Sequence, residues 1–594
     1  MTEPLEILKS YFGYDSFRDG QEEIISNVCN GQDGLVVMPT GGGKSLCFQI
    51  PAKVRKGTGI IISPLIALMK DQVDGLRLSG FEAEFLNSTL ELDQQRQILG
   101  KLRAGKLDIL YIAPEKLFSS DYLISLFKSI PISLFAIDEA HCISQWGHDF
   151  RPEYQKLSIL KKEFPDTPLM ALTATADDIT QKDIQDSLGI SSGFKHLSSF
   201  NRPNITYHSY QRDNGKNQLL DYLRKKRGEA GIVYTLSRKS VEMYASFLNR
   251  KGFKALPYHA GLDQSVRIKN QDAFLNDDVE IIVATIAFGM GIDKSNIRFV
   301  IHMDMPKNVE GYYQETGRAG RDGLQSEAIM FYSRGDLFKM LSFTEVEENP
   351  EQSEIMKKKL YQMADYAESP TCRRQWLMNY FGESHDGNCN SCDICMGDVE
   401  SIDGTTAAQK VCSAIARTNQ QYGQSHIIDF LKGSRSQKIP DWQRELKTFG
   451  VGSEYTKKEW NHYIRQMIQQ GIVNQDTSHF NILKLNELSM EVLRGNKKVS
   501  LYALRKPEKT TSTPEEISEN GLFDYLRDIR RKLASQNNIP PYVVASDATL
   551  KEIVRMNPKS EKELLFVKGI GEAKVQKFGK AILKGLRDFE KLVK

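Results

Sequence analysis

Short apolar runs alternate with longer amphipathic stretches along residues 1–340 of this 594-residue chain. The runs are rich in Val, Ile, Leu and Ala, a composition typical of strands that are buried on both faces of a parallel sheet. They form two sets, separated by the helix-breaking sequence Asn201-Arg202-Pro203-Asn204. The predicted strands are 34–38, 59–63, 108–113, 134–138 and 169–173 in the first set, and 231–235, 255–259, 280–285, 299–303 and 328–332 in the second. We therefore expect an α/β fold with two doubly wound lobes.

The pattern becomes mainly helical in the remainder of the chain. Residues 345–354 are acidic and open a helical region that contains four of the eight cysteines. Residues 405–500 predict helices that lead into a hairpin at 471–485, and residues 506–518, rich in Thr, Ser, Pro and Glu, predict a flexible linker. Residues 521–594 predict a last, small helical unit. All apolar runs are far shorter than the roughly 18 residues that span a bilayer, so no membrane segment is expected.

Composition narrows the classes of function. The hydrophobic fraction of 40% is sufficient for several cores and excludes general disorder. The first residues lack the basic and apolar parts of a signal peptide, which favours a reducing, cytoplasmic environment. The net charge of +3 argues against a protein that coats nucleic acid by bulk charge alone.

The charge is nevertheless distributed unevenly along the chain. Residues 405–500 contain 14 Lys+Arg against 8 Asp+Glu, and residues 520–594 contain 16 against 9. Residues 501–519 contribute −1, so residues 1–404 carry a net charge of −9. An acidic N-terminal part therefore precedes two basic modules, and we assign to these modules the steady attraction for a polyanion.

A glycine-rich segment follows the first predicted strand and precedes a helical stretch. It reads Pro39-Thr40-Gly41-Gly42-Gly43-Lys44-Ser45. Backbone N–H groups of such a loop surround phosphates, the lysine reaches the β- and γ-phosphates, and the hydroxyl after it binds Mg²⁺. The strict pattern has Gly where Met38 stands, and a glycine-rich turn that binds no nucleotide is the alternative.

Two carboxylates, Asp138 and Glu139, stand at the end of the strand predicted at 134–138. Ligands of open α/β sheets bind at this end of the strands. Asp138 is then placed to hold Mg²⁺ through water, and Glu139 to orient and deprotonate an attacking water. A solvated acidic pair is the alternative, but together with Lys44 and Ser45 the pair predicts a nucleoside triphosphatase.

Four cysteines form the pattern C-x16-C-x2-C-x2-C. They are Cys372, Cys389, Cys392 and Cys395. Two-residue gaps allow one turn to direct successive thiolates to the same ion, and four thiolates are typical of a closed, structural Zn²⁺ site. An iron–sulfur cluster is the alternative.

Several blocks of sequence in the two lobes carry a resemblance to a known family. They are Phe17-Arg18-x-x-Gln21, the glycine-rich loop, residues 63–72, Asp138-Glu139-Ala140-His141, and residues 172–176, 258–262, 284–293 and 314–321. With these blocks the chain resembles the RecQ family of superfamily 2 DNA helicases, which also has Met at the position of Met38. The resemblance implies two RecA-like motor lobes, a helical zinc-binding subdomain, a winged-helix domain and a small all-α helical bundle.

The resemblance also implies roles for residues of the nucleotide site. Tyr14 would stack on the base, while Arg18 and Gln21 would read the adenine. Gln314, Arg318 and Arg321 would come from lobe 2. Arg318 and Arg321 lie three residues apart, so on a helix they would share one face. We expect Arg321 to be the arginine finger that stabilises charge on the γ-phosphate, with Arg318 assisting. A surface arginine pair is the alternative.

The expected DNA contacts are fewer and rest on the same resemblance. Trp146, Phe150 and Arg151 belong to an aromatic-rich loop at 141–152, where the rings would stack on unpaired bases. Thr173 belongs to the block that links hydrolysis to lobe movement. In the hairpin, His479 or its neighbour Phe480 would stack on the terminal base pair, and a surface hairpin with Phe480 turned inward is the alternative.

The terminal helical unit contains the sequence Val567-Lys568-Gly569-Ile570-Gly571 before a predicted helix. Such a turn can present N–H groups to a phosphate, or it can simply join two helices. Both interpretations remain open.

The resemblance divides the chain into lobe 1 (1–203), lobe 2 (204–342), a zinc-binding subdomain (343–404), a winged-helix domain (405–500), a linker (501–518) and a helicase-and-RNase-D C-terminal domain (519–594). It implies an ATP- and Mg²⁺-dependent helicase with one structural Zn²⁺, which moves 3′→5′ and acts in recombination and repair. The expected partners are single-stranded and forked DNA and a single-stranded-DNA-binding protein. We expect a monomer in the bacterial cytoplasm, associated with the nucleoid. An RNA helicase, a passive nucleic-acid-binding protein and a double-strand translocase are the alternatives.

Overall fold

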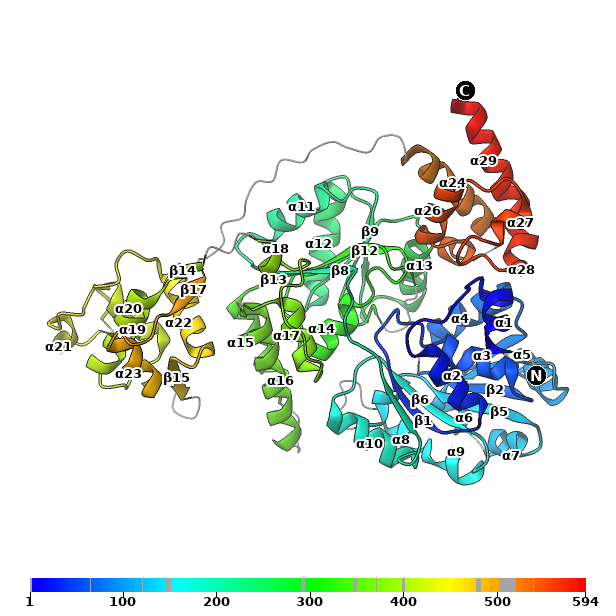
Figure 1. Cartoon of the computed structure of the whole chain (residues 1–594), viewed down its shortest axis with the longest axis horizontal. Coiled ribbons are helices and arrows are strands. Elements are labelled where there is room, and N and C mark those ends of the chain that lie inside the picture. Colours follow the sequence, from blue (N-terminus) through cyan, green and yellow to red (C-terminus); the bar gives the residue numbers. More distant parts are fainter. Residues whose placement is uncertain are drawn as a thin grey trace. The chain divides into compact units, whose positions relative to one another are not determined.

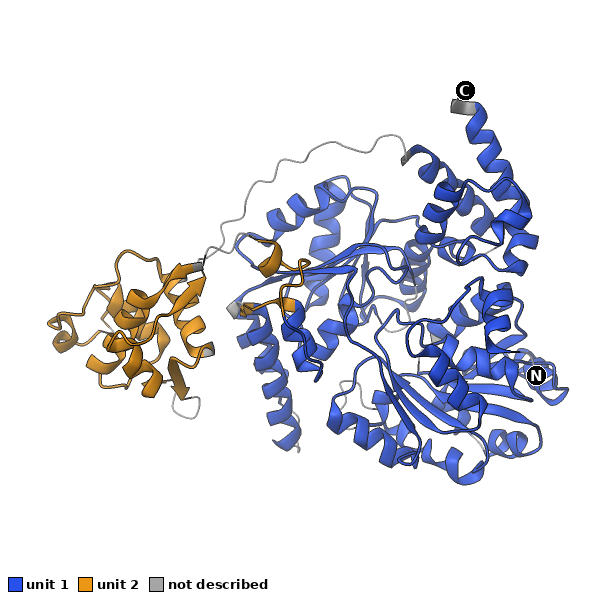
Figure 2. Ribbon diagram, in the orientation of Figure 1, with its two compact units in different colours: residues 1–367, 374–386, 515–594 blue, residues 368–373, 387–514 orange. Residues whose placement is uncertain are grey.

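The apolar runs of the N-terminal half form two parallel β-sheets in a computed structural model of the protein (Figure 1). The structure describes residues 3–64, 66–119, 121–144, 151–289, 294–345, 350–369, 371–397, 401–437, 439–476, 482–502, 520–537 and 539–593. The chain divides into two compact units (Figure 2). The first unit consists of residues 1–367, 374–386 and 515–594, and the second of residues 368–373 and 387–514.

The first sheet has seven strands in the order β3-β4-β2-β5-β6-β1-β7, all parallel. The strands are β1 (Gly34–Val37), β2 (Thr58–Ile62), β3 (Ala83–Leu86), β4 (Ile109–Ile112), β5 (Ile132–Ile137), β6 (Leu169–Thr173) and β7 (Phe194–Leu197). We call the part of the chain that carries this sheet lobe 1. The helices of lobe 1 are α1 (Pro4–Ile7), η1 (Leu8–Phe12), α2 (Gln21–Cys29), α3 (Leu46–Val54), α4 (Ile66–Leu78), α5 (Leu92–Arg103), α6 (Pro114–Leu117), α7 (Tyr122–Lys128), η2 (Ala140–Ile143), α8 (Pro152–Gln155), α9 (Ser158–Glu163) and α10 (Asp178–Leu188).

Both faces of the first sheet are covered. Val36 packs into a core with residues of α2, α3 and α4, among them Ile24 and Phe48. Its neighbours Leu35 and Val37 point to the opposite face, because side chains alternate along a strand, and they are also fully buried. This double burial is why the interior strands are recognisable as continuous apolar runs.

The second sheet has six parallel strands in the order β10-β11-β9-β12-β13-β8. They are β8 (Ile205–Gln211), β9 (Ala230–Tyr234), β10 (Ala255–Tyr258), β11 (Ile281–Ala284), β12 (Ile297–His302) and β13 (Ser326–Tyr332). We call this part of the chain lobe 2. Its helices are α11 (Gly215–Arg224), α12 (Arg238–Arg250), α13 (Gln264–Leu275), α14 (Val309–Thr316) and α15 (Arg334–Leu341), followed by α16 (Pro350–Glu368), α17 (Arg373–Tyr380) and α18 (Asp393–Met396).

Three strands of the two sheets are absent from the sequence-based prediction, namely β3, β7 and β8. Each lies at an edge of its sheet. An edge strand has a neighbour on one side only and exposes more of its surface, so it carries polar residues between apolar ones. In β8 buried and more exposed residues alternate accordingly. The apolar run that reveals an interior strand is therefore missing in these three edge strands, whereas the fourth edge strand, β10, was predicted at 255–259.

The terminal helical domain, which we define as residues 520–593, belongs to the first unit. Its helices are α24 (Asn520–Gln536), α25 (Pro541–Val544), α26 (Asp547–Met556), α27 (Glu561–Leu564), α28 (Glu572–Lys574), η3 (Val575–Gly579) and α29 (Lys580–Val593). Apolar residues of these helices, such as Leu526, Ile553 and Phe578, form a small core of their own.

The second unit contains a helical domain with two pairs of antiparallel strands. Its helices after α18 are α19 (Thr405–Arg417), α20 (Gln424–Leu431), α21 (Asp441–Arg444), α22 (Lys457–Gln469) and α23 (Glu487–Leu493), and its strands are β14 (Ser401–Asp403), β15 (Val473–Asp476), β16 (Ile482–Leu485) and β17 (Ser500–Tyr502). Trp460 is fully buried in its core and donates a 2.7 Å hydrogen bond to the Gly452 carbonyl. The pair β15–β16 is the hairpin predicted at 471–485.

The predicted fold class is confirmed, with two doubly wound lobes followed by smaller helical parts. Among the described residues, no helix is both long and apolar enough to cross a bilayer.

Candidate nucleotide site and metal centre

A cavity of about 850 Å³ lies where loops of lobe 1 and lobe 2 meet. A volume of this size is typical of a small-molecule site. Thirteen of the residues that the sequence proposed for the nucleotide site line it: Tyr14, Arg18, Gln21, Thr40, Gly41, Gly43, Lys44, Ser45, Asp138, Glu139, Gln314, Arg318 and Arg321. Tertiary folding thus brings together segments as far apart in sequence as Tyr14 and Arg321.

The glycine-rich loop between β1 and α3 depends on its glycines. Gly41 and Gly43 have φ angles of 80° and 91°, in the left-handed region that other residues rarely adopt. A Cβ on Gly42 would lie 2.7 Å from Cγ of Met38 and 2.9 Å from the Pro39 carbonyl oxygen. The Met38 side chain, which is buried, therefore packs directly beneath the loop, and the methionine that departs from the strict pattern has a packing role.

Lys44 is held against its own loop. Its Nζ donates hydrogen bonds to the carbonyl oxygens of Met38, at 2.8 Å, and Pro39, at 3.3 Å. Burial lowers the pKa of Lys44, while the carboxylates of Glu139 and Asp138 act to raise it and the charge of Arg321 acts to lower it. The electrostatic environment of Lys44 thus combines the acidic pair of lobe 1 with an arginine of lobe 2.

The segment before α2 braces the same loop. Arg18 donates a 2.7 Å hydrogen bond from Nη1 to the Gly41 carbonyl, and Gln21 donates a 3.1 Å bond from Nε2 to the Gly43 carbonyl. Gln21 also accepts a 2.9 Å bond from the Arg18 backbone N–H. The residues expected to read the adenine are therefore coupled directly to the loop expected to hold the phosphates.

Asp138 and Glu139 follow β5 at its carboxyl end. Glu139 adopts a left-handed conformation with a φ of 50°, and its N–H donates a 3.0 Å bond to Oδ1 of Asp138. Tyr154 donates a 3.1 Å bond from its hydroxyl to the Asp138 carbonyl. A non-glycine residue with positive φ at such a place is typical of functional sites, where surrounding contacts impose the strain.

A buried histidine joins the acidic pair to β6. His141 Nδ1 lies 3.4 Å from Oε2 of Glu139 and 2.9 Å from Oγ1 of Thr173. Thr173 is fully buried, and its hydroxyl also donates a 3.2 Å bond to the Thr175 carbonyl. The buried position of Thr173 favours the role expected of residues 172–176, which is to link hydrolysis to lobe movement. It argues against the direct DNA contact that is expected of Thr173.

Arg318 and Arg321 lie in turns after α14 ends at Thr316, so they do not share a helix face. Arg318 is buried and donates from Nη1 to the Gly289 carbonyl of its own lobe. Both arginines nevertheless line the cavity. Their proximity results from the turn at Gly317–Gly320 and not from helical periodicity.

Arg202 is a residue of the site that the sequence did not reveal. It lies between the lobes and is buried, with 8% of its surface exposed. Its Nη1 donates to the carbonyls of Thr40 and Gly317, the latter at 3.1 Å, and its Nη2 donates to Ala319 at 3.0 Å and Gly320 at 3.2 Å. One guanidinium thus connects the glycine-rich loop to the turn that carries Arg318 and Arg321. In the sequence, Arg202 is recognisable only as part of the helix-breaking segment 201–204.

Three of the expected DNA contacts lie outside the described residues. Trp146 and Phe150 fall in residues 145–150, and His479 falls in residues 477–481. Arg151 is partly buried, and its Nη1 lies 3.4 Å from the Pro64 carbonyl, in the block at 63–72.

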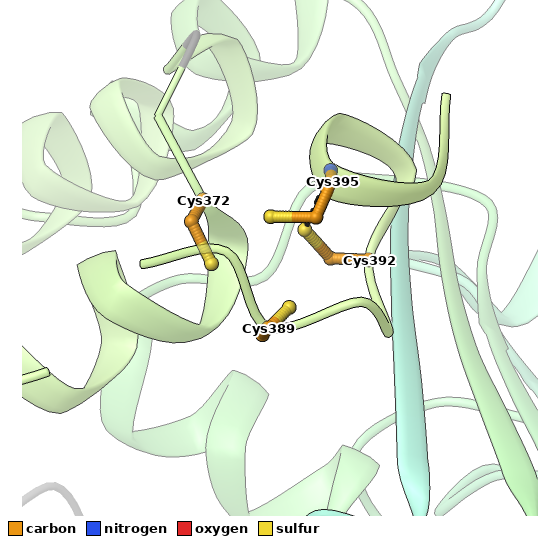
Figure 3. A group of neighbouring side chains, drawn as sticks. All are labelled: Cys372, Cys389, Cys392 and Cys395. Atoms are coloured by element: carbon orange, nitrogen blue, oxygen red, sulfur yellow. Dashed lines mark hydrogen bonds between the residues drawn. The ribbon is translucent and has the colours of Figure 1, made fainter. Parts of the chain in front are cut away.

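The four cysteines of the second unit converge, as Figure 3 shows. Their sulfur atoms all lie within 4.8 Å of one another. A tetrahedral Zn²⁺ with Zn–S bonds of about 2.3 Å needs sulfurs that are roughly 3.8 Å apart, so the four thiols fit this ion after small adjustments. Cys372 precedes α17, whereas Cys389, Cys392 and Cys395 come from the loop and first turn around α18.

A buried ion pair holds the two halves of this cysteine cluster together. Arg373, next to Cys372, bonds Asp393, next to Cys392, through Nε–Oδ1 at 3.0 Å and Nη2–Oδ2 at 3.3 Å. Cys392 Sγ also accepts a 3.3 Å bond from the Cys395 backbone N–H. Such contacts around a metal site orient its ligands.

Comparison with family models divides the chain into five matching regions. Residues 18–184 match the DEAD/DEAH box helicase model, residues 215–323 the helicase conserved C-terminal domain, residues 334–396 the RecQ zinc-binding model, residues 398–510 the RQC domain, and residues 519–586 the HRDC domain.

Three bacterial relatives align over nearly the whole chain, each described as an ATP-dependent DNA helicase RecQ. The protein of Haemophilus influenzae is 46% identical over 590 residues, covering 98% of this chain and 95% of the relative. That of Pasteurella multocida is 45% identical, covering 99% and 94%, and that of Bacillus subtilis is 40% identical, covering 99% and 98%.

Proposed function

The chain belongs to the RecQ family of ATP-dependent DNA helicases, and from this premise we propose that it moves 3′→5′ along single-stranded DNA and unwinds duplexes in recombination and repair. The observation that carries the proposal is the cavity between the lobes, which gathers a phosphate-binding loop, an acidic pair and two arginines of the opposite lobe. A site built from both lobes can convert hydrolysis into relative movement of the lobes.

Within this site we assign roles residue by residue. Lys44 contacts the β- and γ-phosphates of ATP. The phosphates are surrounded by Thr40 and by the backbone N–H groups of Gly41, Gly42 and Gly43. Ser45 and Asp138 hold Mg²⁺. A Mg²⁺ ion held by these two residues would neutralise charge that develops on the phosphate oxygens. Glu139 orients and deprotonates the attacking water. Tyr14, Arg18 and Gln21 bind the adenine.

For lobe 2 we propose that Arg321 acts as the arginine finger, with Arg318 and Gln314 assisting. The position of Arg321 supports this choice, because Arg321 lines the same cavity as Lys44 and Glu139. Arg318 donates instead to Gly289, and this bond fits a supporting residue. An arginine finger stabilises the transition state because its guanidinium carries the positive charge in a fixed fork.

Coupling to DNA is proposed to run through the buried contact of Glu139, His141 and Thr173. A change at the acidic pair would reach β6 through only two side chains, with distances of 3.4 and 2.9 Å. We propose that Trp146, Phe150 and Arg151 contact single-stranded DNA, and that His479 contacts the terminal base pair of a fork.

The charge distribution supports a division of labour between the parts of the chain. The acidic lobes hold DNA through particular groups, whereas the basic winged-helix and terminal modules supply steady attraction. We retain the domain boundaries 1–203, 204–342, 343–404, 405–500 and 519–594 as proposals. A monomeric, cytoplasmic protein that cooperates with a single-stranded-DNA-binding protein completes the proposal.

The test is a strand-displacement assay on partial duplexes that carry a 3′ or a 5′ single-stranded tail. With ATP and Mg²⁺, we expect the protein to release the strand only from the substrate with the 3′ tail. Lys44→Ala should lose both strand release and ATP turnover while it still binds DNA.

Different results identify the alternatives. ATP turnover stimulated by RNA but not by single-stranded DNA would indicate an RNA helicase. Turnover without strand release would indicate a translocase, and unchanged turnover in Lys44→Ala would refute the nucleotide site.

A further inference from the structure

The turn at residues 567–571 in the terminal helical domain lies directly on lobe 1. Gly569 donates a 3.1 Å hydrogen bond from its N–H to the carbonyl of Gly13, the residue before Tyr14. A Cβ on Gly13 would lie 2.6 Å from the carbonyl carbon of Ile570, and one on Gly571 would lie 2.9 Å from the Ser10 carbonyl oxygen. The two glycines thus permit a backbone-to-backbone contact with the segment that precedes the expected base-stacking residue.

The same domain contacts lobe 2 through a buried arginine. Arg530 of α24 is buried, with 1% of its surface exposed. Its Nη1 donates a 2.7 Å hydrogen bond to Asp547 of its own domain, and its Nη2 lies 3.4 Å from Oδ2 of Asp277 in lobe 2. Asp277, which follows α13, also pairs with the fully buried Lys294. Burial alone would raise the pKa of Asp277, but Lys294 and Arg530 hold it below its ordinary value. Two carboxylates and two cations therefore form one buried network across the contact between the terminal domain and lobe 2.

The terminal domain also supplies one wall of the nucleotide cavity. Its cavity-lining side chains include four cations, Lys551, Arg555, Lys568 and Lys574, and one carboxylate, Glu552. The excess of positive charge complements a triphosphate or diphosphate. The domain that supplies this wall is therefore anchored on both lobes, through Gly569 to Gly13 of lobe 1 and through Arg530 to Asp277 of lobe 2.

We propose that the terminal helical domain is a latch that docks across both lobes, closes the nucleotide cavity and slows nucleotide exchange, with Arg530 as the positioning residue that holds it to lobe 2. This inference rests on the proposed nucleotide site. Exchange of ADP for ATP then requires the latch to shift, so the terminal domain regulates the motor whether or not it binds DNA. The buried Arg530–Asp277 contact is poorly screened by salt, unlike a surface ion pair.

The test measures release of a fluorescent ADP analogue from the full-length chain, by rapid mixing with excess unlabelled ATP. Arg530→Ala should accelerate release by about tenfold, because the variant removes one partner of a buried charged contact. Arg531→Ala is the matched control, since Arg531 is the next residue of α24, is exposed, and pairs only within its helix turn with Asp528 among the contacts described. It should release the analogue at the wild-type rate.

Arg530 also bonds Asp547 and the Ala545 carbonyl of its own domain, so a second variant approaches the contact from lobe 2. Asp277→Asn removes the charge but keeps an acceptor for Lys294, and asparagine tolerates the φ of 63° at this position. It should accelerate release as Arg530→Ala does. Thermal melts of all variants report whether each chain is folded.

Wild-type rates in both Arg530→Ala and Asp277→Asn would overturn the latch. Acceleration in Arg530→Ala alone would also overturn it, because the effect would then come from the terminal domain itself. Equal acceleration in Arg531→Ala would do the same. If the wild-type chain binds no analogue, the proposed nucleotide site fails, and the latch fails with it.

Discussion

Replacement of Arg202 tests whether one buried guanidinium aligns the two halves of the nucleotide site. Arg202 donates a hydrogen bond to the Thr40 carbonyl in the glycine-rich loop. It also donates to the carbonyls of Gly317, Ala319 and Gly320, in the turn that carries Arg318 and Arg321 of lobe 2. Arg202→Ala removes all four bonds. Arg202→Lys keeps the charge, but a single ammonium cannot reproduce a planar fork that reaches carbonyls on two lobes.

The size of the effect follows from these bonds. A hydrogen bond from a charged donor contributes about 1.5–3 kcal/mol, but water that enters the vacated space satisfies part of the loss. If the loss of alignment raises the activation free energy by about 2 kcal/mol, kcat falls by about 30-fold, since each 1.36 kcal/mol corresponds to tenfold in rate. The Michaelis constant for ATP should change much less, because the phosphate-loop glycines and Lys44 are untouched.

The assay is DNA-stimulated ATP turnover at saturating single-stranded DNA, with kcat and KM measured separately. Arg212→Ala is the control, since Arg212 is also a largely buried arginine but bonds only within lobe 2 in the contacts described, to Asp304, Asp336, Ser333 and the Met303 carbonyl. A folded Arg202→Ala chain with kcat within twofold of wild type would refute the aligning role. An equal loss of kcat in Arg212→Ala would show that loss of any buried arginine is enough.

Three further outcomes are expected. Glu139→Gln should lower kcat for ATP by about 10²–10⁴-fold with little loss of nucleotide affinity, because the amide cannot accept the proton of the attacking water. Turnover and equilibrium binding measure the two effects, and a weaker affinity with unchanged kcat would contradict this role. Arg321→Lys should lower kcat by about 10³-fold, and Arg318→Lys by clearly less, in the same turnover assay; the reverse order would exchange their roles. Cys392→Ser should lower the zinc content and the Tm, measured by metal analysis and thermal melts. Cys412→Ser changes a buried cysteine of the same unit outside the cluster and should retain one zinc per chain. Equal zinc in both variants would contradict the assigned ligand set.

The features that the sequence predicted well are those encoded by neighbouring residues. Interior strands such as β1 and β5 are continuous apolar runs because both of their faces are buried. The glycine-rich loop and the C-x2-C-x2-C spacing are equally local, since a few consecutive residues determine the turn that directs N–H groups or thiolates to one point. For the same reason the two-lobe α/β fold and the four-cysteine cluster could be predicted before any tertiary contact was known.

Other features depend on segments that are distant in sequence. The edge strands β3, β7 and β8 became recognisable only from their pairing, and Arg318 and Arg321 were brought to the cavity by a turn in place of the expected helix face. Thr173 lies at the end of the interior strand β6, where it is fully buried and contacts His141.

By itself, the sequence determined the fold class, the positions of the glycine-rich loop and the acidic pair after their strands, and the four-cysteine set of the zinc site. Only the tertiary structure decided that Arg202 joins the loops of two lobes and that Arg530 joins the terminal domain to Asp277. An arginine has no distinctive local pattern, because its hydrogen-bond acceptors are backbone carbonyls and carboxylates that any sequence contains. Which of them it meets is determined by the packing of whole domains, where burial makes each such bond costly to leave unformed.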